Sequence, residues 1–169
     1  MSVLETERLL LRPLAPEDAP FMLRLLNEPS FIENIGDRGV RTLEQAARYI
    51  HEGSTKSFQA RGHGLYLVQL KSSRAAAGIC SLLKREQFQE VDIGYAFLPE
   101  FWSQGLARES TAAILDHARN SLALGRIIAL VSPGNAASIK LLEKLGFAFS
   151  ESVLIPPNTA QTSIYRLPD

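Results

Sequence analysis

Hydrophobic and polar positions alternate over residues 91–98, and this period of two predicts a β-strand. The apolar positions are separated by small or polar ones, in the order Val91, Asp92, Ile93, Gly94, Tyr95, Ala96 and Phe97. Pro99 follows closely. Because proline has no N–H to donate to a neighbouring strand, we expect the strand to end at or just before it.

The period changes to three and four after Gly105, as on one face of an α-helix. Apolar or small residues recur in this spacing at Leu106, Ser110, Ala113, Ile114 and Ala118. The sequence therefore predicts a helix that begins near Gly105 and runs to about residue 123.

The turn between this strand and this helix, residues 102–107, is rich in small side chains. The first N–H groups of a helix have no partner within it, and the helix dipole adds about half a positive charge there. The pattern thus suits a phosphate or pyrophosphate on the backbone of 103–108, with Arg108 adding a full charge. An ordinary tight turn is the alternative, and this stretch alone does not decide between the two.

A second motif runs over residues 132–147. Asn135 follows a Pro-Gly pair and is a good N-cap, and Gly146 stands where a left-handed residue closes a helix. Asn135 and Ser138 place two short polar groups on the first turn, after an apolar strand expected at 126–131. For this helix alone, capping is a sufficient explanation.

The remaining patterns predict one α+β (mixed α/β) domain over 1–169, without repeats or linkers. Further strands are expected at 8–14, 65–70, 77–83, 147–155 and 161–167, with turns at 71–74, 85–90 and 156–158. One helix should begin at Pro16 and end at Pro29, and residues 30–41 are interpreted as a loop or broken helix. Another should begin at Thr42, with Gln45 as its capping-box partner, and fade around 53–64.

The composition is that of an ordinary globular chain, with 46% hydrophobic and 21% charged residues. Basic and acidic residues number 18 each, so no net charge favours direct binding of nucleic acid. No apolar run approaches the roughly 20 residues of a membrane span, and we expect a cytoplasmic protein. Cys80, the only cysteine, is expected in the core, and the three histidines show no metal-binding pattern.

Together, in this order and spacing, the two motifs resemble the GNAT superfamily of acyl-CoA-dependent N-acetyltransferases, and most closely its RimJ/RimL-type branch. The resemblance covers nearly the whole chain. It is carried by the opening at 4–14, the Ile-Gly-Tyr of 93–95, the Trp-x-Gln-Gly-Leu-Ala of 102–107 and the Asn-x-x-Ser-x-x-Leu-Leu-Glu-Lys-Leu-Gly-Phe of 135–147. It implies the GNAT fold, a mostly antiparallel twisted sheet of about six to seven strands flanked by about four helices.

The resemblance implies that acetyl-CoA lies in a V-shaped opening between the strands at 91–98 and 126–131. Its pantetheine would pair with the exposed strand edge, as an extended segment can, and its pyrophosphate would lie on the turn. Gln104 should act through its backbone rather than its amide. The residues expected to bind the cofactor are Phe97, Leu98, Ser103, Gln104, Gly105, Leu106, Ala107, Arg108, Asn135 and Ser138.

The implied reaction is direct attack of a neutral primary amine on the thioester. The amine must lose a proton, and the leaving thiolate benefits from a donor. Many GNAT enzymes supply this donor from a tyrosine seven residues after the asparagine, but here that position is Leu142. Ser138 is the nearest replacement, and RimL-like members make the same exchange. Its role as general acid and its role in capping and packing both stay open.

Candidates for the general base are Asp92 and Glu90, on the strand that leads to the cleft. Glu33 and Asp37 lie in the irregular segment expected to border the substrate. Each of these carboxylates can equally be a solvated surface group. Trp102 either gates the acceptor side or packs against its neighbour.

Simple magnitudes favour an acceptor of low basicity. An α-amino group with a pKa near 8 costs well under about 1 kcal/mol to deprotonate at pH 7.5, whereas a lysine near 10.4 costs about 4 kcal/mol. A site without an obvious strong base therefore suits an α-amine or another amine of low pKa.

Three questions stay open. The acceptor is a protein N-terminus or a small molecule such as a polyamine, an amino acid or a drug, and the chain is a monomer or a homodimer. A non-catalytic acyl-CoA-binding sensor or assembly protein is the alternative, since the usual tyrosine is missing. A P-loop or dinucleotide-binding protein is disfavoured, because residues 104–107 match neither Gly-Lys-Ser/Thr nor Gly-x-Gly-x-x-Gly.

Overall fold

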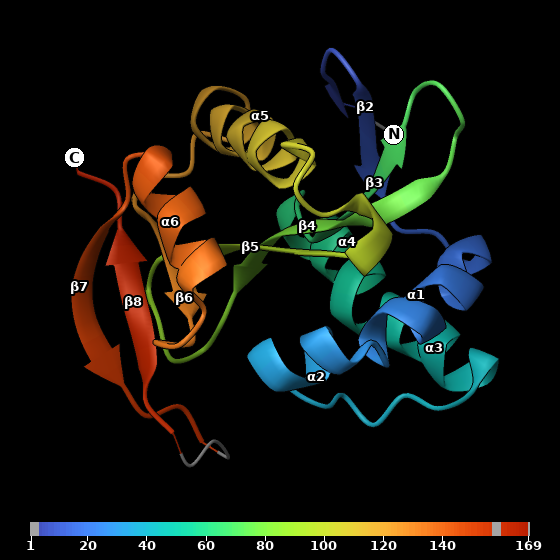
Figure 1. Ribbon diagram of the computed structural model, residues 1–169, viewed down its shortest axis with the longest axis horizontal. Coiled ribbons are helices and arrows are strands. Elements are labelled where there is room, and N and C mark those ends of the chain that lie inside the picture. The colour runs from blue at the N-terminus through green and yellow to red at the C-terminus, as the bar shows by residue number, and fades with distance from the viewer. Residues whose placement is uncertain (1–3, 157–159, 169) are drawn as a thin grey trace.

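The computed structural model describes residues 4–156 and 160–168 and contains one mixed sheet with helices on both faces (Figure 1). The strands are β1 Leu4–Glu5, β2 Leu9–Pro13, β3 Leu65–Leu70, β4 Ala76–Lys84, β5 Val91–Phe97, β6 Ile127–Val131, β7 Ala148–Val153 and β8 Thr162–Arg166. The α-helices are α1 Ala19–Leu26, α2 Pro29–Asn34, α3 Leu43–Ile50, α4 Lys56–Arg61, α5 Leu106–Asn120 and α6 Ala136–Lys144. Shorter turns of helix are η1 Pro16–Asp18, η2 His51–Thr55 and η3 Pro99–Phe101.

The strand order is β1-β2-β3-β4-β5-β6-β8-β7, and every pairing is antiparallel except that of β5 with β6. These two strands are parallel and pair only at Val91–Ile127 and Asp92–Ile128. Beyond Asp92 the rest of β5 has no partner on this side in the described sheet. The sheet therefore opens in its middle, between its two antiparallel halves.

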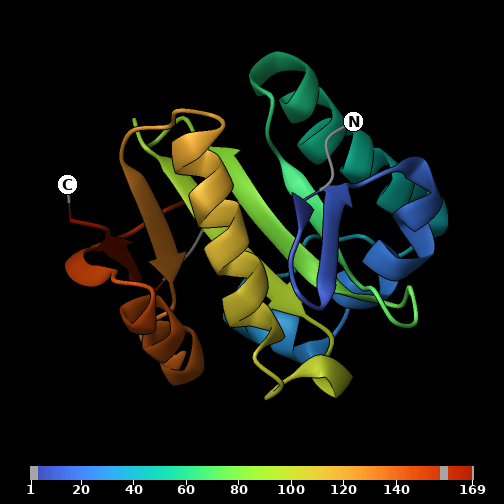
Figure 2. The ribbon, with the colours of Figure 1, turned by 90° about the horizontal axis from the view of Figure 1, so that it is seen from above.

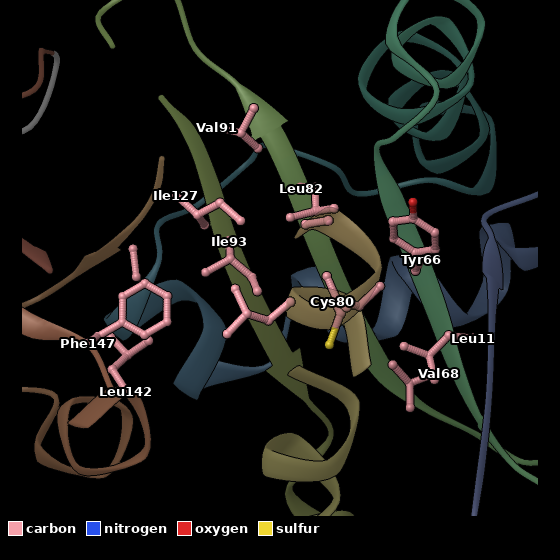
Figure 3. Packing of buried hydrophobic residues seen from close by; sticks show 14 of the residues in the cluster. Leu11, Tyr66, Val68, Cys80, Leu82, Val91, Ile93, Ile127, Leu142 and Phe147 are labelled. Atoms are coloured by element: carbon pink, nitrogen blue, oxygen red, sulfur yellow. The ribbon is translucent and has the colours of Figure 1, made fainter. Parts of the chain in front are cut away.

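Two hydrophobic cores, one on each face, hold the sheet. On one face α5 crosses the strands (Figure 2), and its buried residues pack with those of β2 to β6. Figure 3 shows part of this core, where Leu142 and Phe147 lie beside Ile93 and Ile127. On the other face α1, α2 and α3 cover Leu65, Leu67 and Ile79. Because the side chains of β5 alternate, Val91, Ile93 and Phe97 face the first core, and residues 92, 94 and 96 face the second.

The predicted α+β class and the mostly antiparallel sheet are confirmed, with eight strands in place of six or seven. The β5–α5 unit and the last helix also form as expected. Asn135 caps α6 by accepting a bond from the N–H of Ser138 (3.3 Å), and Gly146 has a left-handed φ of 95°. The predicted turn at 157–158 lies outside the described residues.

The segment from 29 to 61 is more helical than predicted. The first helix does end before Pro29, as expected, with α1 stopping at Leu26. Pro29 then opens α2, since a proline suits the first position of a helix, where no N–H bond is required. The helix that begins after Thr42 does not fade. It passes through η2 into α4, which ends at the left-handed Gly62. As a result, α2 lies close to the opening of the sheet and forms one wall of the cleft described below.

Candidate active site

The free edge of β5 is the first component of the site. The N–H of Leu98 donates to the carbonyl of Ala77 on β4 (3.0 Å), so by alternation Phe97, Tyr95 and Ile93 turn their backbone groups away from β4 and toward the opening. The carbonyl of Leu98 accepts from the N–H of Phe101 (3.0 Å), and the Leu98 side chain is buried. The expectation that Leu98 offers free backbone groups is therefore wrong, whereas Phe97 lies on the available edge.

A cleft of about 780 Å3 runs through this opening and reaches both faces of the sheet. Its lining includes β5 residues, the first turns of α5 and α6, the end of β6 and one side of α2. The Oγ of Ser132, just after β6, donates to the carbonyl of Asn34 at the end of α2 (3.1 Å). This bond joins the two halves of the molecule beside the cleft.

The turn before α5 has the backbone form expected for binding an anion. Ser103 and Gly105 are both left-handed, with φ of 61° and 78°. The first main-chain bond of α5 runs from the N–H of Glu109 to the carbonyl of Gly105 (3.0 Å), so the amides of 106–108 precede it. Ser103, Gly105 and 106–108 line the cleft, but Gln104 does not. The Gln104 side-chain amide donates to the carbonyl of Glu100 (3.2 Å), away from the cleft.

Arg8 and Glu109 fix this turn, and sequence analysis did not identify them. Arg8 donates through Nη1 to the carbonyl of Gln104 (2.9 Å) and through Nε to Glu109 Oε1 (2.8 Å). Glu109 also accepts from the hydroxyl of Thr6 (2.5 Å) and the N–H of Arg8 (3.0 Å). Burial acts to raise the pKa of Glu109, but these bonds outweigh it and hold the pKa below its ordinary value. The carboxylate thus stays ionised and ties the β1–β2 turn to α5.

The first turn of α6 lies on the opposite wall and carries Asn135 and Ser138, both of which line the cleft. The hydroxyl of Tyr95 on β5 donates to the carbonyl of Ser138 (3.2 Å). Burial raises the pKa of Tyr95 to about 12, so its hydroxyl stays protonated at neutral pH. Leu142 is buried in the core (Figure 3). A tyrosine hydroxyl therefore reaches this turn from β5, although α6 itself supplies none in the cleft.

Asp92 lies at the last position where β5 and β6 pair, on the face covered by α2. Its side chain lines the cleft, and the residue is only 4% exposed. Oδ2 accepts from Nε of Arg85 at 2.6 Å. Burial raises the pKa of Asp92, against the charge and the hydrogen bond of Arg85, which lower it. Within the part of the chain that the structure describes, Asp92 is the only carboxylate that lines the cleft.

The other carboxylates suggested by the sequence lie elsewhere. Glu90 is ion-paired with Arg166 of β8 and does not line the cleft. Asp37 is bound by Arg41 (2.6 Å) and by the N–H of Gly39 (2.8 Å). Glu33 is exposed on α2, and neither it nor Asp37 lines the cleft. Of these four candidates, the structure thus brings only Asp92 to the opening.

Trp102 lies at the mouth of the cleft, half-exposed, and its indole Nε1 donates to the carbonyl of Phe97 (2.9 Å). The side chain therefore covers one of the backbone acceptors on the free edge of β5.

Cys80 and His63 are structural, and neither lines the cleft. Cys80 is fully buried near Ser110 (3.2 Å), and burial raises the pKa of its thiol to about 11. His63 is also buried, with Nδ1 2.8 Å from the carbonyl of Leu82. Among the described residues no group of three His, Cys, Asp or Glu side chains is placed to hold a metal ion.

The split between β5 and β6, with the first amides of α5 beside it, agrees with the opening that the resemblance to the GNAT superfamily implies. Residues 8–148 match the acetyltransferase (GNAT) domain family, and the chain belongs to this family. It is an acetyltransferase of the GNAT fold. No helix in the described part of the chain is long and apolar enough to cross a membrane.

Relatives and solved structures agree with this assignment. The chain is 30% identical over 148 residues to the uncharacterized N-acetyltransferase p20 of Bacillus licheniformis. The aligned residues cover 87% of this chain and 83% of that protein. An acetyltransferase structure from Agrobacterium tumefaciens strain C58 superposes with a TM-score of 0.83 at 25% identity, covering 100% of this chain and 95% of the other. RimL, a ribosomal L7/L12 alpha-N-protein acetyltransferase solved with coenzyme A, has a TM-score of 0.84 at 18% identity, covering 98% and 97%.

Proposed function

We propose that this protein transfers the acetyl group of acetyl-CoA directly to the neutral α-amine of a peptide or small molecule. The observation that carries the proposal is the position of Asp92. It is the only described carboxylate in the cleft, and it lies where β5 and β6 part, on the face opposite the amides of α5. The cofactor and the acceptor can therefore approach the opening from opposite faces.

Acetyl-CoA supplies the acyl group as a thioester, and the residues of one face suit its shape and charge. The amides of 106–108 and the side chain of Arg108 would hold the pyrophosphate. The N–H of Phe97 and the backbone of Tyr95 would pair with the extended pantetheine, since Trp102 already holds the Phe97 carbonyl. Asn135, on the facing turn of α6, would bind the same arm from the other wall.

The reaction requires two proton movements, and one residue on each side of the opening is placed for one of them. Asp92 takes a proton from the bound ammonium group and passes it to water, and the neutral amine nitrogen then bonds to the acyl carbon. As the carbon–sulfur bond breaks, the nitrogen gives up a second proton, which the hydroxyl of Ser138 relays to the leaving thiolate. Tyr95 fixes the turn that carries Ser138 through its bond to the Ser138 carbonyl. The products are an acetamide and the free thiol of CoA.

Asp92 suits a weakly basic amine better than a lysine side chain. The raised pKa of a buried carboxylate brings it closer to that of an α-amine, near 8, than to that of lysine, near 10.4. Proton transfer from an α-ammonium to Asp92 is therefore less uphill than transfer from a lysine by a little over two powers of ten.

The experiment is a thiol-release assay with acetyl-CoA and two acceptor sets, one of peptides with varied first residues and one of small amines including polyamines. Each product is located by mass spectrometry. We expect CoA release that depends on the acceptor and acetylation on α-nitrogens. Acetylation confined to lysine side chains would contradict the α-amine assignment. Tight CoA binding without release by any acceptor would instead favour the non-catalytic acyl-CoA-binding alternative.

A further inference from the structure

The described residues that line the cleft carry very unequal charge, although the whole chain is balanced at 18 basic and 18 acidic residues. Asp92 is the only acidic one, and the basic ones are Arg38, Arg85, Arg108, Lys140 and Lys144. This excess is produced by the fold, because the basic residues come from four separate parts of the sequence. Some of these positive charges suit the phosphates of CoA, but others lie on the face opposite the cofactor.

Arg108, Lys140 and Lys144 belong to α5 and α6, on the face assigned to the cofactor. Arg85 and Arg38 belong to the other face. Arg85 follows β4 and is neutralised by Asp92 at 2.6 Å. Arg38 follows α2, the helix that covers the side of the sheet where Asp92 lies.

Arg38 has no ion-pair partner among the described residues. The neighbouring Asp37 is occupied by Arg41, through a contact of 2.6 Å between Oδ2 and Nη2. Arg38 is exposed at the edge of the cleft, and its neighbours in the lining on this side are the neutral Ser30, Asn34 and Tyr49. The acceptor side thus offers one uncompensated positive charge, and its only carboxylate is already paired.

This arrangement disfavours a second positive charge on the acceptor. A polyamine would bring another ammonium group toward Arg38 and would find no free carboxylate in the described lining. An acceptor with a carboxylate would instead form a charge-assisted, bidentate pair with the Arg38 guanidinium. The apolar Phe31, Ile35 and Leu83 would contact the rest of such a molecule.

Resting on the acetyl transfer proposed above, we infer that the acceptor is a primary amine with an acidic side chain near its amino group, recognised by Arg38. A free acidic amino acid and a peptide with an aspartate or glutamate near its N-terminus share this chemistry. Arg38 is then the residue that determines acceptor specificity.

The test compares acceptors of different charge, with each acid matched to its own amide. Peptides that begin Ala-Asp are assayed against the same peptides beginning Ala-Asn and Ala-Lys, with free glutamate, glutamine and spermidine as a small-molecule arm. A hydrogen-bonded pair between charged groups predicts about a tenfold higher kcat/KM for the acid over its amide, carried mainly by KM. If the preference for the acid is larger among the peptides, the acceptor is a peptide. If it is larger among the small molecules, the acceptor is a free amino acid.

Three variants link this preference to the residue. Arg38→Gln should bring the ratio of acid to amide close to one, and Arg38→Lys should restore part of it. Arg48→Gln removes the same charge from an exposed position of α3 that does not line the cleft, and it should leave the ratio unchanged. Measurable transfer with no preference for the acid, or a preference that survives Arg38→Gln, would overturn the inference and leave the proposed function intact. Absence of transfer to every acceptor, with CoA still bound, would overturn both.

Discussion

The substitution Asp92→Asn should separate catalysis from stability, because the carboxylate contributes little to folding. Burial raises the pKa of Asp92 more than Arg85 lowers it. Below about pH 3.9, the ordinary pKa of an aspartate, the group is protonated and its raised pKa favours folding. This stabilisation is lost as the pH rises through the raised pKa of the folded protein. Above this raised value, where Asp92 is ionised, the carboxylate is therefore a net cost to folding, which a neutral asparagine avoids.

The loss of the ion pair with Arg85 is also small. The Arg85 side chain is 36% exposed, so water can solvate the guanidinium when its partner is gone. Because the Asp92 side chain is only 5% exposed, we place this pair at the upper end of the range for exposed pairs, at about 1 kcal/mol. We therefore expect the free energy of unfolding to change by no more than about 1 kcal/mol, which is roughly 2–4 °C in Tm for a chain of this size.

The effect on transfer should be much larger. A positioned general base contributes about 10²–10⁴-fold, so kcat for an α-amine acceptor should fall at least about 100-fold at pH 7. The deficit should be largest near pH 6 and shrink toward pH 9, because an amine with a pKa near 8 is about 1% neutral at pH 6 and about 90% neutral at pH 9. Thiol release measured at saturating acceptor over this range, with Tm by calorimetry, tests both statements.

Glu90→Gln is the matched control, since Glu90 lies next to the same strand but is held by Arg166 outside the cleft. Its kcat should stay within a few-fold of wild type. If Asp92→Asn kept wild-type kcat at pH 6, or lost kcat equally at pH 6 and pH 9, Asp92 would not be the base.

The other predictions concern the cofactor side. Ser138→Ala should slow thiol release by about tenfold or less, because a CoA thiolate leaves fairly well without a donor. An unchanged rate would leave Ser138 a role in packing alone. Glu109→Gln should weaken CoA binding measured by calorimetry and lower the free energy of unfolding by about 1 kcal/mol, since it breaks the clamp with Arg8. Equal CoA affinity in this variant would contradict the positioning role. Trp102 is the only tryptophan, so CoA beside the Phe97 backbone should change its fluorescence in a saturable way. A bound state with unchanged emission would place the cofactor elsewhere.

Local signals in the sequence predicted a large part of this structure. The alternation at 91–97 and the capping pattern of Asn135 and Gly146 are properties of neighbouring residues, and both formed as expected. Pro29 marked the end of the first helix correctly, but no local signal showed that it also starts α2, which depends on the packing of Phe31.

The site itself depended on contacts between distant parts of the chain. Arg8 and Glu109 are 101 residues apart, and the pair that occupies Glu90 joins β8 to the start of β5. No local pattern in the sequence shows that Glu90 is held outside the cleft by Arg166 while Asp92 lines it. The direction of the Leu98 backbone was equally hidden, because it follows from the register of β5 on β4.

The most direct test of direct transfer follows both products at once. Wild-type protein is incubated with acetyl-CoA, first alone and then with an α-amine acceptor, and the masses of protein and acceptor are recorded beside the free thiol. The account predicts an unmodified protein in the first stage, since Cys80 is fully buried, and one acetylated α-nitrogen for each thiol released in the second. An acetylated protein that passes its acetyl group on, or thiol release without an acetylated amine, would contradict it.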